Sequence, residues 1–263
     1  MTRFAPWLGL LLLASGCDEK KTSPAPAVSS LAPSLPPPGG TSTKFTIDPE
    51  SKTSIEMEAP KEKIKATATG GAGTLDVDLT NLTASRGEVK MDLTTLTTST
   101  FPEEAKNKSQ TTHARTWLEV ADGEEGKVDD KVKEANRYAV YAIRAIDKVS
   151  ANDVTKLPAE KDGSDDVRVV TLVTRGDLLV HGHKVEREAE VELKLHYPSG
   201  GDATKPSWIA IKSRKPFRVV LADHEVKPRD GLGKIAKQSF HLLGTKVADN
   251  ADITLDLRAK AAP

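Results

Sequence analysis

Apolar and charged residues alternate over long stretches of this sequence, and that alternation constrains the fold more than any other feature. Across residues 185–197 every second residue is apolar apart from Arg187, and the residues between them are charged. Residues 251–260 repeat the same period of two. Successive side chains of a strand point to opposite faces, so both segments predict strands with one apolar and one charged face. Such strands belong to antiparallel sheets that are wet on one side.

Shorter segments with the same character lie between turn signals rich in glycine or proline. They cover residues 75–79, 89–93, 167–173, 208–213 and 217–221. Only residues 102–110 and 128–136 have helical character. The pattern predicts an all-β domain, a sandwich or a barrel, that is interrupted by short helical insertions.

The N-terminal residues have the features of a secretory signal peptide. Arg3 precedes a short apolar run, and small residues lead into Cys17, the only cysteine in the 263-residue chain. The run is shorter than the roughly 20 residues of a membrane-spanning helix. The segment resembles the lipobox of bacterial lipoproteins. This resemblance implies removal of residues 1–16, acylation of Cys17 by palmitate-like chains, and a lipid anchor on the periplasmic face of the inner or outer membrane.

Residues 17–43 are predicted to be the lipidated cysteine and a linker. Six prolines lie between residues 18 and 43, with serine, threonine and glycine around them. Such a composition cannot bury enough apolar surface to fold, so the linker is expected to hold a single domain, residues 44–263, away from the membrane. Lysine plus arginine equals aspartate plus glutamate at 38 each, which gives no basic excess for nucleic acid.

Motifs for catalysis or metal binding are weak. His181 and His183 would share one face of a strand, but a zinc site needs three or four ligands and no third has a recognisable spacing. Residues 231–234 lack both the upstream glycine and the serine or threonine of a phosphate loop. The chain has no Gly-x-Ser-x-Gly motif. The sequence therefore predicts no catalytic residue, no metal site and no cofactor.

Several segments, in order, resemble the YceI-like domain. They include the hairpin motif at residues 175–185, Phe45 with Ser51 near the start, Ser213-Arg214 with Phe217, and the closing residues 243–257. The resemblance implies a lipocalin-like antiparallel β-barrel with a long apolar channel and no catalytic residues. It also implies an exported protein, since members are exported and some bind polyisoprenoids or other long amphiphiles.

On this interpretation the chain is a non-enzymatic lipoprotein whose barrel binds a long-chain lipid or isoprenoid, and the membrane is contacted through acylated Cys17. The candidate channel residues are the large apolar side chains of the expected strands. They are Leu75, Val77, Leu79, Val89, Met91, Leu93, Val191, Leu193, Leu195, Trp208, Phe217, Ile253, Leu255 and Leu257.

Two alternatives stay open at the level of sequence. In the first, the barrel is filled by its own side chains and the protein acts in interaction or assembly within the cell envelope. In the second, His181 and His183 belong to a metal-dependent enzyme.

Overall fold

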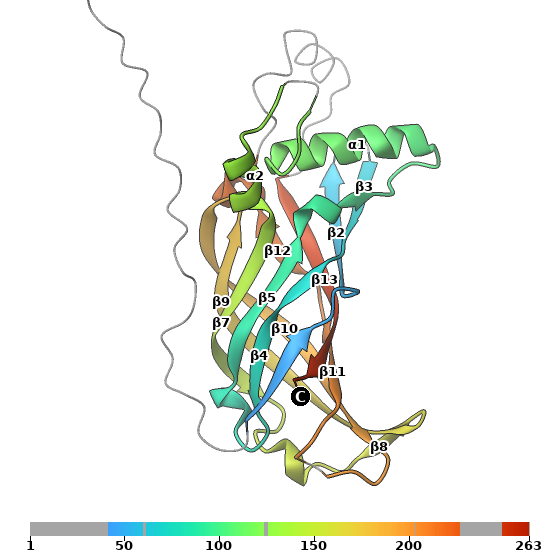
Figure 1. The fold of residues 1–263 in the computed structure, drawn as a ribbon, viewed down its shortest axis with the longest axis vertical. Coiled ribbons are helices and arrows are strands. Elements are labelled where there is room, and N and C mark those ends of the chain that lie inside the picture. The colour runs from blue at the N-terminus through green and yellow to red at the C-terminus, as the bar shows by residue number, and fades with distance from the viewer. Residues whose placement is uncertain (1–41, 60–61, 124–125, 203, 227–248, 263) are drawn as a thin grey trace, which may run out of the picture.

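The computed structural model describes residues 42–59, 62–123, 126–202, 204–226 and 249–262, which form an antiparallel β-barrel with a helix across one end (Figure 1). Neighbouring strands pair in the order β1-β4-β5-β7-β9-β10-β11-β13, and β1 also pairs with β13. The sheet therefore closes on itself. This architecture confirms the expectation of an all-β, lipocalin-like barrel.

The ring has eight strand positions, because several strands are bent into two consecutive segments. In order around the ring they are β1 (Ser42–Ile47) with β2 (Lys52–Ala59), β4 (Gly71–Asp78) with β3 (Glu62–Ala68), β5 (Arg86–Asp92) with β6 (Thr97–Thr98), β7 (Tyr138–Val149), β9 (Asp165–Val180), β10 (His183–Pro198), β11 (Trp208–Ser213) with β12 (Phe217–Val220), and β13 (Asn250–Ala261). The short strand β8 (Glu160–Asp162) pairs only with the start of β9.

The corner between β1 and β2 closes the ring against β13. The Ser51 hydroxyl donates to the Arg258 carbonyl at 3.2 Å and accepts from the Arg258 amide at 3.0 Å. Asp48, at the same corner, lies 2.7 Å from the Lys260 ammonium. The hydrogen bond from Lys260 lowers the pKa of Asp48 below its ordinary value. Side chains thus satisfy the backbone groups that the bend frees from the sheet.

The predicted strands are confirmed, and the two helices lie where helical character was expected. Residues 185–197 fall within β10, which pairs with β9 over its whole length. Helix α1 (Glu104–Trp117) is longer than the predicted 102–110. Helix α2 (Asp130–Asn136) begins after Asp129, whose carboxylate accepts a hydrogen bond from the Lys131 amide at 2.9 Å.

Strand β7 was not predicted, and its sequence explains why. Tyr141 and Ile143 point inward, but a bulge between Ile143 and Ala145 moves the next inward residue to Ile146. On the opposite face Val140 and Ala142 are also buried. With both faces apolar and the period interrupted, β7 shows no alternation that a window of residues could detect.

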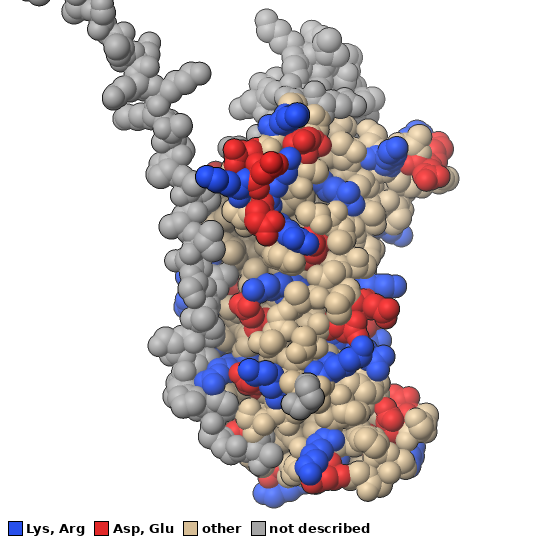
Figure 2. Space-filling view, in the orientation of Figure 1, with Lys and Arg blue, Asp and Glu red and all other residues tan. Residues whose placement is uncertain are grey.

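The outer surface carries charges of both signs, which are interspersed over the face seen in Figure 2. Several form cross-strand pairs, such as Arg218 with Asp252 at 3.0 Å. No helix among the described residues is long and apolar enough to cross a membrane. The signal peptide, Cys17 and most of the linker, residues 1–41, lie outside the described residues, as do residues 227–248. The predictions made for these segments stay predictions.

Candidate ligand-binding cavity

One half of the barrel encloses a cavity of about 550 Å³, and all eight strand positions contribute to its wall. This volume lies within the roughly 300–1,000 Å³ of pockets that hold small ligands. Most of the wall is aliphatic or aromatic, and alanines such as Ala66, Ala68, Ala189 and Ala251 line it where larger residues would fill the space. The cavity is therefore suited to an apolar guest.

Eleven of the fourteen candidate channel residues line this cavity; that a ligand contacts them stays a prediction. They are Leu75, Val77, Val89, Met91, Leu93, Val191, Leu193, Phe217, Ile253, Leu255 and Leu257.

Leu79, Leu195 and Trp208 do not line it, which corrects the predicted set. Leu79 and Leu195 point inward but are fully buried in packed side chains at the other end of the barrel. Trp208 points outward, because the alternation along β11 places its neighbour Ile209 inside. Its indole stacks on His196 at 3.4 Å between ring centroids, and the Arg258 guanidinium lies 4.1 Å from its ring.

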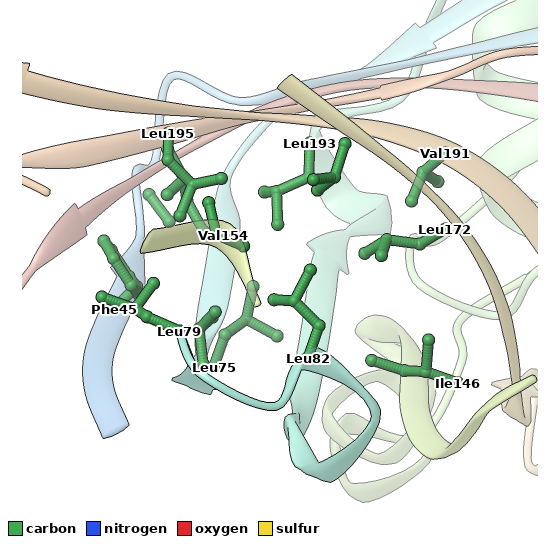
Figure 3. Packing of buried hydrophobic residues seen from close by; sticks show 14 of the residues in the cluster. Phe45, Leu75, Leu79, Leu82, Ile146, Val154, Leu172, Val191, Leu193 and Leu195 are labelled. Atoms are coloured by element: carbon green, nitrogen blue, oxygen red, sulfur yellow. The ribbon is translucent and has the colours of Figure 1, made fainter. Parts of the chain in front are cut away.

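We call the packed end of the barrel the closed end: the cluster of Phe45, Leu79, Leu82, Val154, Leu195 and Tyr197 (labelled in part in Figure 3). Two short 3₁₀ helices, Leu82–Ala84 and Val154–Lys156, contribute to it. The Val154 amide donates to the Leu79 carbonyl at 2.9 Å, which ties the second of these helices to the end of β4. All six residues of the cluster are at most 1% exposed, and of the six only Leu82 also borders the cavity, so the cavity ends at this cluster.

Helix α1 covers the hollow half, across the ends of β2 and β3 (Figure 1). The Asn107 side chain bonds both the amide and the carbonyl of Phe101, and the Arg115 guanidinium donates to the Leu96 carbonyl at 2.8 Å. Ala114, Trp117 and Leu118 complete the cavity wall. Sequence reasoning missed these three residues, although their i, i+3, i+4 spacing is the signal of an apolar helix face.

Two polar side chains that line the cavity, Tyr141 and Thr174, bond to each other. The Tyr141 hydroxyl lies 3.2 Å from the Thr174 carbonyl, 3.1 Å from the Thr174 hydroxyl and 3.1 Å from the Arg187 carbonyl. Burial raises the pKa of Tyr141 to about 12. The hydroxyl is thus neutral and engaged with the protein, which leaves it unsuited to act as a nucleophile or a base.

The hairpin motif at residues 175–185 has a structural explanation. A Cβ at Gly176 would lie 2.4 Å from the Ala142 carbonyl oxygen and 2.8 Å from the Tyr141 ring, so only glycine fits beneath that tyrosine. The Asp177 carboxylate lies 2.6 Å from the guanidinium of Arg144, which is on the neighbouring strand β7. The motif therefore packs β9 closely against β7.

His181 and His183 form no metal site with the described residues. Their ring centroids are 6.1 Å apart, and no group of three or more histidine, cysteine, aspartate or glutamate side chains among the described residues is arranged to bind a metal. His181 Nδ1 faces the His224 carbonyl at 3.1 Å, and Nε2 lies 3.3 Å from a Glu119 carboxylate oxygen. These contacts join the β9–β10 turn to His224, which follows β12, and to Glu119, which follows α1.

No protein-family model matches this chain, and no curated protein is similar to it in sequence. Solved structures with a similar fold include the following two. A polyisoprenoid binding domain from Saccharophagus degradans, implicated in plant cell wall breakdown, has a TM-score of 0.49 at 11% identity and covers 83% of this chain and 98% of its own. BcnA from Burkholderia cenocepacia has a TM-score of 0.46 at 11% identity and covers 81% of this chain and 99% of its own.

Proposed function

We propose that this protein binds a long apolar ligand, a polyisoprenoid or a similar lipid, and performs no chemistry on it. The observation that carries the proposal is the cavity of about 550 Å³ inside the barrel, with its apolar wall. Burial of apolar surface contributes about 25 cal/mol per Å². A chain that buries on the order of 300 Å² would gain roughly 7 kcal/mol before the cost of its immobilisation.

A binding role agrees with the interior chemistry better than catalysis does. Tyr141 and Thr174 are engaged with each other and with backbone carbonyls, so neither is paired with a base that would activate it. The assembly alternative requires a filled barrel, and only the closed end meets that requirement.

The location that fits this function is the cell envelope, where long-chain lipids are found. We propose that Cys17 is acylated and anchors the barrel to a membrane, because the lipobox-like segment precedes it and no other cysteine exists. Two or more acyl chains give stable anchoring where one chain alone is marginal. Replacement of Cys17 by serine should release the protein from membranes, which fractionation and intact-mass measurement would detect.

The decisive experiment is native mass spectrometry of the full chain. The protein is purified from the cells that produce it and is then exchanged into a volatile buffer. We expect co-purified lipid, or uptake of an added C20 or longer prenyl chain at a stoichiometry of one. The variant Ala251→Phe, which places a ring in the cavity, should lose this adduct. A protein that neither carries a lipid nor takes up any chain would refute the proposed function.

A further inference from the structure

The face of α1 that lines the cavity changes character along the helix. Lys106, Gln110 and His113, at i, i+4 and i+7, line it from residue 104 to residue 113, which we call the polar part of α1, whereas Ala114, Trp117 and Leu118 line it beyond that point. A helix that only covered an apolar core would present an apolar stripe along its whole length. The polar part of α1 therefore faces something that is not hydrocarbon.

The cavity reaches solvent beneath the polar part of α1. Lys106 and Ser109 line the cavity and are also exposed, which places the mouth beside these two residues. Glu62, at the start of β3, lies on the opposite side of this mouth and also lines the cavity.

Lys106, the positive charge at the mouth, is paired with a neighbour. Its ammonium lies 2.8 Å from the Glu103 carboxylate and 5.7 Å from the centroid of the Phe101 ring. The Gln110 amide nitrogen lies 3.4 Å from a Glu62 carboxylate oxygen, and its carbonyl oxygen accepts from the Thr100 hydroxyl at 2.6 Å. These side chains therefore offer no unpaired cation to an acidic head group.

Two polar side chains at the mouth are free to form hydrogen bonds with a ligand. The side chains of Ser109 and His113 line the cavity and form no hydrogen bond or ion pair with any other residue that the structure describes. An imidazole and a hydroxyl each donate and accept. They can serve a partner that offers both a donor and an acceptor.

We propose that the ligand is a single-headed amphiphile whose head is uncharged and hydrogen-bonding, such as an alcohol, and that this head lies at Ser109, Gln110 and His113 while the chain runs toward Leu193 and Ile209. This inference rests on the proposed function and adds the orientation and the head chemistry. The C-terminal end of α1 and the strands then cover the chain, and the polar part of α1 covers the head.

The test compares three probes with one C20 prenyl chain: the alcohol, the parent hydrocarbon and the carboxylic acid, competed against each other in native mass spectrometry. We expect the alcohol to bind at least tenfold more tightly than the hydrocarbon, and more tightly than the acid. The double variant Gln110→Leu/His113→Leu should reduce the advantage of the alcohol over the hydrocarbon to below threefold. Lys108→Ala, an exposed residue of α1 that does not line the cavity, is the matched control and should leave it unchanged.

A second variant tests the charge balance. Glu103→Gln removes the partner of Lys106, so the affinity for the acid should rise several-fold while that for the alcohol stays the same. Equal binding of alcohol and hydrocarbon by the native protein would overturn the head assignment and leave the proposed function standing. Preference of the native protein for the acid would overturn the uncharged head. Failure of all three probes to bind would refute the proposed function itself.

Discussion

The two ends of the barrel are built from the same strands and differ in whether their interior is filled. On β10, Leu195 and Tyr197 are at most 1% exposed in the closed end, whereas Ala189 on the same inward face lines the cavity. On β13, Ala259 is packed in the core and Ala251 borders the cavity. An eight-stranded barrel is wide enough to be filled by large side chains or to hold one small ligand. In this protein one end is filled and the other is hollow, and the size of the inward residues makes the difference.

The largest expected effect comes from a matched pair of leucine truncations. Leu195→Ala, in the closed end, removes a fully buried side chain and leaves a void, so it should lower the free energy of unfolding by about 3–5 kcal/mol. Leu255→Ala, in the wall of the cavity, enlarges a space that already exists and should cost less than about 1.5 kcal/mol. Urea unfolding of both variants measures the difference. Equal losses would mean that the hollow half is packed as tightly as the closed end.

The next effect comes from a pair of substitutions on β13 that enlarge the side chain instead of truncating it. Ala259→Phe forces a ring into the packed core and should destabilise the protein by about 1–3 kcal/mol. Ala251→Phe places the same ring in the cavity, where space exists, and should leave stability nearly unchanged.

The two variants should rank in the opposite order for ligand binding, with the larger loss in Ala251→Phe. Uptake of a prenyl chain should fall at least tenfold in Ala251→Phe and remain in Ala259→Phe, as far as that variant is folded. Thermal unfolding with and without the chain would show this, since a ligand at 100 times its Kd adds about 2.7 kcal/mol to stability. A stabilising response to the chain by Ala251→Phe, equal to that of the native protein, would contradict the position of the site.

The smallest effect concerns pH and two buried histidines, one at each end. Burial lowers the pKa of His224, whose ring lies at the hollow half with Nδ1 3.0 Å from the His183 carbonyl. Burial also lowers the pKa of His196, which stacks on Trp208, although Asp165 opposes the shift. Below about pH 6.5 the unfolded chain therefore binds more protons at these two histidines than the folded protein does.

Stability should therefore be constant above about pH 6.5 and fall as the pH decreases through the interval between the unfolded and folded pKa values, by at most about 1.4 kcal/mol per pH unit for each histidine. His196→Gln and His224→Gln should each remove a part of this decline, which urea unfolding from pH 7.5 to 5 would show. A decline of unchanged slope in both variants would remove these histidines as its cause.

Sequence reasoning identified strands whose two faces differ and missed those whose faces do not. Strands β10 and β13 alternate apolar and charged residues, so their inward faces could be read directly. Strand β7 has buried residues on both faces and a bulge at Ile143, which removed the signal. Three candidate channel residues do not line the cavity, for two different reasons. Leu79 and Leu195 point inward but lie in the closed end. Trp208 points outward, because the alternation along β11 places Ile209 inside.

The sequence by itself determined which side chains of the regular strands point inward, because the two-residue period is a local property of an extended backbone. It also indicated an apolar interior and a helical segment after residue 101. Only the tertiary structure decided where that interior is filled and where it is hollow. That outcome depends on which inward residues of eight strands meet at the same level of the closed barrel, and Phe45, Val154 and Leu195 are far apart in the chain although they pack together. The polar mouth was likewise decided by where α1 lies, since its residues acquire their role only when the helix covers the open end.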